Sequence, residues 1–247
     1  MIRRFLPLLV LPAAFLIACG GGGSKSNTAT PAPGQTTVAG TPGGPSDTPA
    51  PTPPDPFQSL QAYRYTLAVS SESEQLTVAG TVKAPDSNQL DISLEGQLAL
   101  SAIILGDKAW LNDASTNEWA PVDVAEAEAN IQGLLPRDFW GVLPLDELSG
   151  AGKDLGEEDV NGVPTHHYQI TNANQQLLSD LAVLFGGANG EPPQAFSMDL
   201  WRADDGGWPA KATIDVTFAE GAPITIAHID WSTSDVNSSS VSITPPA

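Results

Sequence analysis

Three histidines and 29 acidic residues are the side chains of this 247-residue chain that could hold a metal ion or transfer a proton. His166 and His167 are adjacent in a stretch with strand periodicity, and adjacent residues of a strand point to opposite faces. They are therefore expected not to share a metal ion, and His228 lies far away in the sequence. Two dense acidic groups, Glu157-Glu158-Asp159 and Asp204-Asp205, suggest calcium but lack the spacing of an EF-hand loop, so we interpret them as solvated turns.

Motifs of hydrolytic and phosphate chemistry are missing from the sequence. It contains no Gly-x-Ser-x-Gly elbow, no His-Glu-x-x-His and no Walker loop. A pair of carboxylates that meet only in the folded chain, as in glycoside hydrolysis, stays open as an alternative. We predict a protein that is not an enzyme and that uses no cofactor and no metal.

The single cysteine, Cys19, has neighbours that indicate lipid modification. Leu16-Ile17-Ala18-Cys19-Gly20 resembles the bacterial lipobox, in which an apolar residue stands three positions before the cysteine and a small residue just before it. In that pattern the cysteine becomes the first residue of the mature protein and carries a diacylglycerol. Several acyl chains on one cysteine make a durable anchor, because each buried CH₂ contributes about 0.8 kcal/mol. A lone cysteine also excludes a disulfide framework and a Cys-based metal site.

The chain divides by composition into three parts. Residues 1–18 are predicted to be a lipoprotein signal peptide, because Arg3 and Arg4 precede a short apolar stretch that ends at the lipobox. Residues 19–56 contain the lipidated cysteine and a disordered Gly/Pro/Thr/Ala-rich tether with too little apolar surface to fold. Residues 57–247 are long enough for a single domain with its own core. We expect an exported protein, anchored to the cell membrane through Cys19, whose domain faces the periplasm or the cell exterior.

The charge of the chain excludes two classes of partner. With 10 basic against 29 acidic residues, the formal net charge is −19. Binding to the nucleic-acid backbone needs a basic patch, so nucleic acid is not an expected partner. Broad electrostatic attachment to anionic lipid headgroups is disfavoured for the same reason. No apolar run is long enough to predict an ordinary membrane-spanning helix.

Alternating apolar and polar residues begin at Ala62 and predict strands. Tyr63, Tyr65 and Leu67, for example, alternate with polar neighbours. Turn residues such as Pro85–Asn88 and Gly106-Asp107 separate successive runs as far as Leu111, which indicates an antiparallel meander. Further strands are predicted at 163–171, 195–203, 208–220, 223–234 and 240–243.

Two segments break this pattern with helical spacing. One helix is predicted from Val124 to Leu135 with Asp123 as its N-cap. The stretch 138–148 is a short helix or an apolar loop broken by Pro144, and a second helix runs from Asn172 or Asn174 to Phe185, where Gly186-Gly187 ends it. One sheet with helices on one face is the α+β arrangement. Because a long sheet curls, its concave face and the helices would enclose an apolar space.

Several segments together resemble the LppX/LprG (LprA/LprF) lipoprotein family, which is related in fold to the LolA and LolB lipoprotein carriers. They are the lipobox with its tether, Gly106–Trp110 with Glu118–Asp123, Glu158–Tyr168, and the closing strands from Ile214 to Pro246. The most specific piece is Asn161-Gly162-Val163-Pro164, where Asn-Gly favours a tight turn and proline sets φ at a strand start. The resemblance implies an α+β fold: a curved antiparallel β half-barrel with helices packed over its concave face, which holds or transfers lipid.

An acyl-chain ligand would then lie between the sheet and the helices. The residues expected to contact it are Leu94, Leu98, Leu100, Ile131, Leu135, Phe139, Trp140, Leu177, Leu181 and Phe185. The assignment depends on strand register, because a slip of one residue moves a side chain to the other face. Delivery of the ligand would require opening, which is expected at Phe139–Leu148 or at Phe185–Pro193; the sequence leaves open whether a protein partner receives the lipid.

The alternative is a non-enzymatic envelope scaffold or adhesion lipoprotein that binds protein or glycan through its surface. A solidly packed core would favour this alternative, whereas an apolar cavity of roughly several hundred Å³ would favour a lipid carrier. Tryptophans in a row on the surface would indicate a glycan platform, although such rings more often pack in a core. The six are Trp110, Trp119, Trp140, Trp201, Trp208 and Trp231.

Overall fold

The computed structural model describes residues 55–72, 74–141, 143–171, 193–218 and 226–246. In chain order the strands are β1 (Ala62–Ser71), β2 (Gln75–Lys83), β3 (Ser87–Leu94), β4 (Gln97–Leu105), β5 (Lys108–Asp113), β6 (Glu118–Val122), β7 (Lys153–Val160), β8 (Val163–Thr171), β9 (Ala195–Ala203), β10 (Pro209–Thr217) and β11 (Ile226–Ser234). The helices are α2 (Val124–Ile131), α3 (Pro136–Trp140) and α4 (Leu145–Ala151), and they lie between β6 and β7 in the chain.

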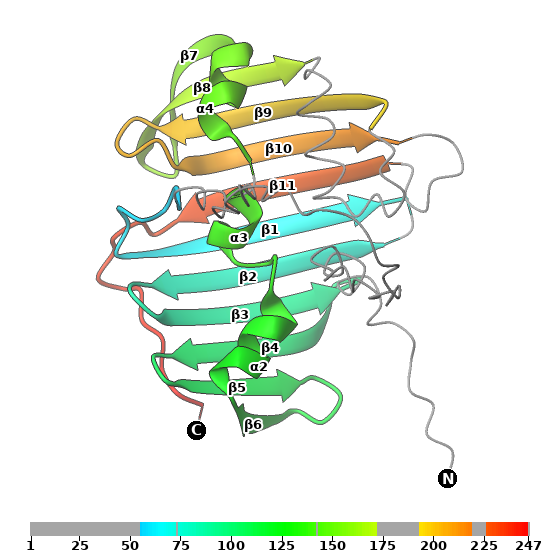
Figure 1. Cartoon of the computed structure of the whole chain (residues 1–247), viewed down its shortest axis with the longest axis vertical. Helices are drawn as coiled ribbons and strands as arrows, with labels where there is room; N and C mark the ends of the chain where they lie inside the picture. Colours follow the sequence, from blue (N-terminus) through cyan, green and yellow to red (C-terminus); the bar gives the residue numbers. More distant parts are fainter. Residues whose placement is uncertain (1–54, 73, 142, 172–192, 219–225, 247) are drawn as a thin grey trace, which may run out of the picture. The chain divides into compact units, whose positions relative to one another are not determined.

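All eleven strands belong to one antiparallel sheet, in the order β6-β5-β4-β3-β2-β1-β11-β10-β9-β8-β7. The pairing of β1 with β11 joins an N-terminal meander to a C-terminal one. The sheet is curved and unclosed, with β6 and β7 as its free edges. Figure 1 shows the three helices crossing one face of the sheet in a row, from α2 over β4 and β5 to α4 beside β8. The predicted α+β half-barrel with helices over its concave face is confirmed.

Strand alternation decides which side chains form the core. In β1, Tyr63, Tyr65 and Leu67 are buried, whereas the residues between them are exposed. Directly paired residues share a face, and Leu67 stands opposite Val78 on β2 and Trp231 on β11, both of which are buried. The apolar side of the sheet is therefore the concave side, which the helices cover.

Tight hairpins connect successive strands within the meanders, as the sequence predicted. Asn161-Gly162 joins β7 to β8 with φ values of 55° and 82°, the left-handed pair that a two-residue turn requires. Asn161 also donates from Nδ2 to the carbonyl oxygen of Thr233 at 2.8 Å, which ties the turn to the end of β11. The turn thus reverses the chain between β7 and β8 and also bonds it to the distant strand β11.

The helices differ from the predicted ones in their bounds. The helix that begins at Val124 ends at Ile131 and not at Leu135, because Gln132 leaves the helical region with ψ 137° and Gly133 has φ +80°. Asp123 occupies the N-cap position, but its side chain makes no capping hydrogen bond. The stretch 138–148, left open between helix and loop, forms most of α3 and α4, with Pro136 starting α3. Among the described residues no helix is long and apolar enough to cross a membrane.

Three strand predictions need correction. Lys153–Val160 forms β7, so the acidic group Glu157-Glu158-Asp159 is a strand and not a turn. Its side chains are mostly exposed because it is a free edge, and it therefore lacks the apolar alternation that signals a strand. The predicted strand at 240–243 is not one; the terminal segment is held instead by Asn237, whose Oδ1 accepts from the backbone N–H of Gln61 at 2.8 Å. β10 is shorter than predicted, since it runs from Pro209 to Thr217; 219–225, which includes the predicted start of the next strand, lies outside the described residues, as does the predicted helix from 172 or 174 to 185.

Gly80 makes room for a tyrosine at the centre of the sheet. It stands opposite Tyr65, and a Cβ atom at position 80 would collide with the Tyr65 ring. That ring is unable to move aside easily, because it stacks on Trp231 at a centroid distance of 5.0 Å and its hydroxyl donates to the carbonyl oxygen of Leu134 at 3.0 Å. Because Gly80 has no side chain, the Tyr65 ring can pack directly against the backbone of β2.

We predict that Gly80→Ala lowers the free energy of unfolding by about 1–3 kcal/mol, the usual cost of forcing extra carbon into a packed core. Denaturant unfolding followed by tryptophan fluorescence measures it. Gly150→Ala in α4 is the matched control, because a Cβ there meets nothing within 4 Å. The control should leave stability unchanged or raise it by up to about 1 kcal/mol, since alanine favours a helix. Equal effects of the two variants would contradict the steric explanation.

Candidate functional site

Four of the predicted ligand contacts lie on the helical connection and are buried against the sheet. They are Ile131, Leu135, Phe139 and Trp140. Ile131 ends α2, whereas Phe139 and Trp140 are the last residues of α3. Gly133, with φ +80°, ends the helical conformation between α2 and α3, so each short helix turns its own apolar residues toward the sheet. The sequence thus identified the inward-facing residues of this connection correctly; whether they touch a ligand stays a prediction.

Aromatic rings fill the centre of the concave face beneath α3. Phe139 lies parallel to Trp231 with an interplanar angle of 4° and centroids 5.9 Å apart, and Trp140 meets the same ring edge-on at 5.5 Å. Tyr65 stacks on Trp231 from β1, and Phe57 lies 5.9 Å away. Such pairs add to the burial of the rings themselves. Side chains of the protein occupy the space at this point, so a ligand here would have to displace them.

Burial keeps the polar atoms of this cluster neutral. Burial raises the pKa of the Tyr63 hydroxyl far above its ordinary value, with a smaller contribution from the charge of Asp55. Burial likewise raises the pKa of Tyr65, whose hydroxyl is bonded to the backbone. The indole N–H of Trp140 is buried and finds no acceptor among the described residues. A single unpaired donor in an apolar surrounding is a place where an oxygen atom of a ligand or a water molecule would be stabilised.

A half-buried apolar surface continues from this core to one end of the sheet. We call Val69, Leu76, Leu94 and Leu100 the apolar rim. Leu76 stands opposite both Val69 and Leu94, and Leu100 stands opposite Ile92, whose side chain belongs to the core. The rim therefore lies on the concave face, at the ends of β1 to β4. Two of the predicted contacts, Leu94 and Leu100, are part of it.

Leu98 is separated from the rim by a bulge. The β3–β4 ladder shifts register between Ile92 and Ser93, so that Leu98 pairs with Ser93 and not with a concave-face residue. Alternation along β4 had placed Leu98 beside Leu100, but the extra residue of a bulge reverses the alternation. Leu98 is 47% exposed, the value expected outside the core. Simple period-two counting does not detect such a shift.

The remaining predicted contacts, Leu177, Leu181 and Phe185, lie outside the described residues, as does Cys19. The same holds for most of the expected opening segment Phe185–Pro193. The other expected opening segment, Phe139–Leu148, covers the end of α3 and the start of α4.

The two adjacent histidines have separate partners, as strand geometry requires. His167 lies between two carboxylates on the outer face, with Nδ1 3.0 Å from Glu158 Oε1 and Nε2 3.0 Å from Asp199 Oδ1. Its ring stacks on Trp201 at 4.1 Å. His166 contacts a different carboxylate, Asp204, at 2.8 Å. Among the described residues no group of three or more His, Cys, Asp or Glu side chains is arranged to hold a metal ion.

His228 forms a second histidine–carboxylate cluster on the outer face, which the sequence did not reveal. Its Nδ1 lies 2.7 Å from Asp215 Oδ1 on β10, and its Nε2 lies 3.0 Å from Asp230 Oδ2 on its own strand. The hydrogen bond that His228 donates to Asp215 raises the pKa of His228 above its ordinary value, and Asp230 adds to the effect. Only the β10–β11 register brings Asp215 opposite His228. The polar alternation of β10 signals an outward face, but not these partners.

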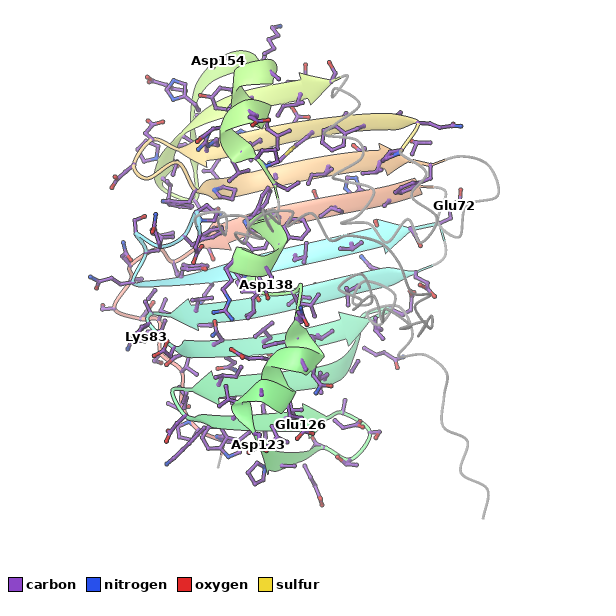
Figure 2. The ribbon with its side chains drawn as sticks, in the orientation of Figure 1. Glu72, Lys83, Asp123, Glu126, Asp138 and Asp154 are labelled. Atoms are coloured by element: carbon purple, nitrogen blue, oxygen red, sulfur yellow. The ribbon has the colours of Figure 1, made fainter. Side chains whose placement is uncertain are left out.

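The surface of the helical layer is acidic. Figure 2 shows Asp123 and Glu126 at the start of α2 and Asp138 on α3. Arg137 is the one basic residue of these three helices, and its ion pairs with Glu128 and Asp138 are long, at 3.5 Å. Exposed ion pairs contribute little to stability. A ligand that approaches the concave face across the helices therefore meets negative charge.

Comparison with known proteins gives similarity of fold alone. No family model and no curated protein matches the sequence. Among solved structures, the lipoprotein LppX of Mycobacterium tuberculosis is similar with a TM-score of 0.46 and 15% identity, over 76% of this chain and 93% of LppX. LprF of Mycobacterium bovis is similar with a TM-score of 0.44 and 12% identity, over 78% of this chain and 93% of LprF. Both are lipoproteins that the sequence resemblance names, but at these identities and TM-scores no activity follows.

We predict that His228 stabilises the protein more at acidic than at alkaline pH. Because its folded-state pKa is raised above 6.5, its contribution is complete below pH 6.5 and is lost as pH rises through the folded-state pKa. The difference in unfolding free energy between wild type and His228→Gln should therefore be largest below pH 6.5 and should shrink as pH rises through the folded-state pKa. Urea unfolding at several pH values measures it. NMR titration of the His228 ring gives the pKa directly, and Asp215→Asn should move it back toward 6.5; a wild-type pKa at or below 6.5 would contradict the prediction.

Proposed function

We propose that this protein is an exported, lipid-anchored protein of the cell envelope that binds the acyl chains of a lipid on the concave face of its half-barrel. The observation that supports this proposal is the apolar rim. It exposes part of a continuous apolar surface that runs from the ends of β1 to β4 into the buried core. The half-buried side chains of the rim are the place where an acyl chain would pack against the protein.

Binding would be passive and would rest on apolar burial. An acyl chain laid along the rim gains about 25 cal/mol for each Å² of apolar surface removed from water. Its headgroup stays in solvent, because the helices that flank the concave face carry Asp123, Glu126 and Asp138 and repel an anionic group. The rim and the aromatic cluster offer few groups for chemistry, so the protein acts by holding its ligand and not by catalysis.

Deeper entry of a ligand would need movement of the helical connection. α3 is short and contacts the sheet chiefly through Phe139 and Trp140, which pack on Trp231. Gly133 precedes it with φ +80°, a left-handed conformation that glycine adopts readily, whereas Gly141 follows it in the ordinary right-handed helical region. Displacement of α3 would open the aromatic cluster and bring the unpaired N–H of Trp140 into contact with the ligand.

A second function has its own support. The rings beneath α3 pack as a core does, and a solid core is the feature expected of an envelope scaffold or adhesion lipoprotein that binds protein or glycan through its surface. In that case the rim is a surface for contact with another protein. The two functions differ in whether lipid is retained when the protein is isolated.

The test is native mass spectrometry with lipid extraction on the unit Pro54–Ala247, which is compact and has its own core. Expressed in a bacterial host without the anchor, it should carry close to one lipid per chain, which a fluorescent acyl probe displaces. A clean mass without lipid, together with no binding of the probe, would reject lipid binding in favour of the scaffold.

We predict that Leu94→Asn weakens binding of the acyl probe roughly fivefold, because removing a half-buried leucine from the contact costs about 1 kcal/mol. Leu98→Asn is the matched control, since Leu98 belongs to the same hairpin but pairs with Ser93 across the bulge. Probe titration measures both, and unfolding curves check that both variants fold. Equal loss in both variants, or no loss with Leu94→Asn, would place the ligand elsewhere.

We also predict that Cys19→Ser abolishes lipid modification. Residues 1–18 would act as the signal peptide, residues 19–56 as the anchor and tether, and 57–247 as the binding domain. In cells fed a labelled palmitate analogue, the wild-type chain should carry label and partition into detergent, because several acyl chains make the anchor durable. The variant should lose both properties. Ser24→Ala, in the tether, is the control and should keep them; label retained by Cys19→Ser would refute the anchor.

A further inference from the structure

A hollow lies at the opposite end of the sheet from the rim. It has a volume of about 320 Å³, within the range of ligand sites, and is lined by side chains of β8, β9 and the β9–β10 turn. Its lining residues are His166, Tyr168, Arg202, Ala203, Asp204 and Gly207. β11 and β10 lie between β9 and the strands of the rim, so the hollow is a separate site.

The guanidinium group of Arg202 forms one side of this hollow, and its position is held by hydrogen bonds and an ion pair. Its Nε donates to the carbonyl oxygen of Gly207 at 2.9 Å, and its Nη1 donates to Ser149 Oγ on α4 at 3.0 Å. Its Nη2 lies 2.8 Å from Asp146, whose side chain is 93% exposed, whereas that of Arg202 is 19% exposed. A Cβ at Gly207 would come within 2.7 Å of Nη2, so glycine leaves this side of the guanidinium accessible to a small group. The cation is thus held in place before any ligand arrives.

Two rings and a carboxylate form the other wall. His166 Nδ1 donates to Asp204 Oδ1 at 2.8 Å, and the rings of His166 and Tyr168 lie 6.3 Å apart with an interplanar angle of 29°. The hydrogen bond that His166 donates to Asp204 raises the pKa of His166 above its ordinary value, with smaller contributions from the charges of Asp154 and Glu157. Within the described part of the chain, the Tyr168 hydroxyl, His166 Nε2 and Asp204 Oδ2 make no hydrogen bond. The hollow therefore offers donors, an acceptor and ring faces together.

The charges around the hollow limit the class of ligand. Asp146, Asp154, Glu157 and Asp204 oppose an anion such as phosphate. Arg202 in the wall opposes a cation, and both Arg202 and His166 already have carboxylate partners. A neutral ligand that donates and accepts hydrogen bonds, and that has an apolar face for the rings, meets all of these requirements. A sugar ring has these properties, because its hydroxyls lie at the edge and its C–H groups form a face.

We infer that this hollow binds one neutral hexopyranose unit, with hydroxyls donating to Asp204 Oδ2 and accepting from Arg202 and Tyr168. The C–H face of the sugar packs on the rings of His166 and Tyr168. The site is independent of acyl binding at the rim, because it shares no residue with it.

The experiment uses the full chain in a detergent without a sugar headgroup. Saturation-transfer NMR is recorded with the methyl α-glycosides of glucose, galactose and mannose, and separately with inorganic phosphate and tetramethylammonium. At least one glycoside should bind at millimolar concentration and shift the ring resonances of His166. Asp204→Ala should weaken this binding at least tenfold, because it removes a hydrogen bond to a charged group, and Tyr168→Phe should weaken it severalfold.

Asp205→Ala is the matched control, since Asp205 is also an exposed carboxylate of the turn but does not line the hollow. It should bind the glycoside as wild type does. The inference is overturned if no glycoside binds, if phosphate or tetramethylammonium binds in its place, or if Asp204→Ala and Asp205→Ala behave alike. Acyl-probe binding by Asp204→Ala should equal that of wild type, so the failure of one proposal leaves the other unaffected.

Discussion

The structure depends on the pairing of β1 with β11 and on the aromatic contacts that this pairing brings together. Residues more than 150 positions apart in the chain become neighbours there, as in the pairing of Leu67 with Trp231. Trp231 then receives Tyr65 from β1, Phe139 and Trp140 from α3, and donates from its indole to the carbonyl oxygen of Pro209 at 3.2 Å. Without this contact the two meanders would share no core, and α3 would have no surface to cover.

An unclosed sheet also has to protect its edges from pairing with another chain. β7 does so with three successive acidic residues from Glu157 and with a bulge at Gly156, where φ is +104°. At the other edge, β6 contains Pro121, which has no N–H to offer. Charge, a bulge and proline are the usual means of blocking edge-to-edge association. The acidic residues of β7 thus serve the fold.

The concave face is packed more completely in its middle than at its two ends. Beneath α3 the aromatic rings fill the available space, whereas at the ends of β1 to β4 the smaller side chains of the rim stay half-buried. At the β8–β9 end, polar side chains replace apolar ones, and the pairing of Arg202 with α4 keeps a hollow open. Packing therefore stabilises the middle of the concave face and is less complete at its two ends. On the outer face, the side chains of His167 and Trp201 are already hydrogen-bonded to the carboxylate of Glu158.

The sequence by itself determined the features that depend on near neighbours in the chain. Period-two alternation predicted the strands of the meanders, Asn161-Gly162 predicted its hairpin, and apolar spacing identified the inward-facing residues Ile131 and Leu135. These signals are local, because propensity, alternation and turn geometry act over a few residues. Only the tertiary structure decided the strand order, the bulge that separates Leu98 from Leu100, and the meeting of His166 with Asp204 in one hollow. Each of these results from register between strands, which packing of the whole sheet selects and which no single segment encodes.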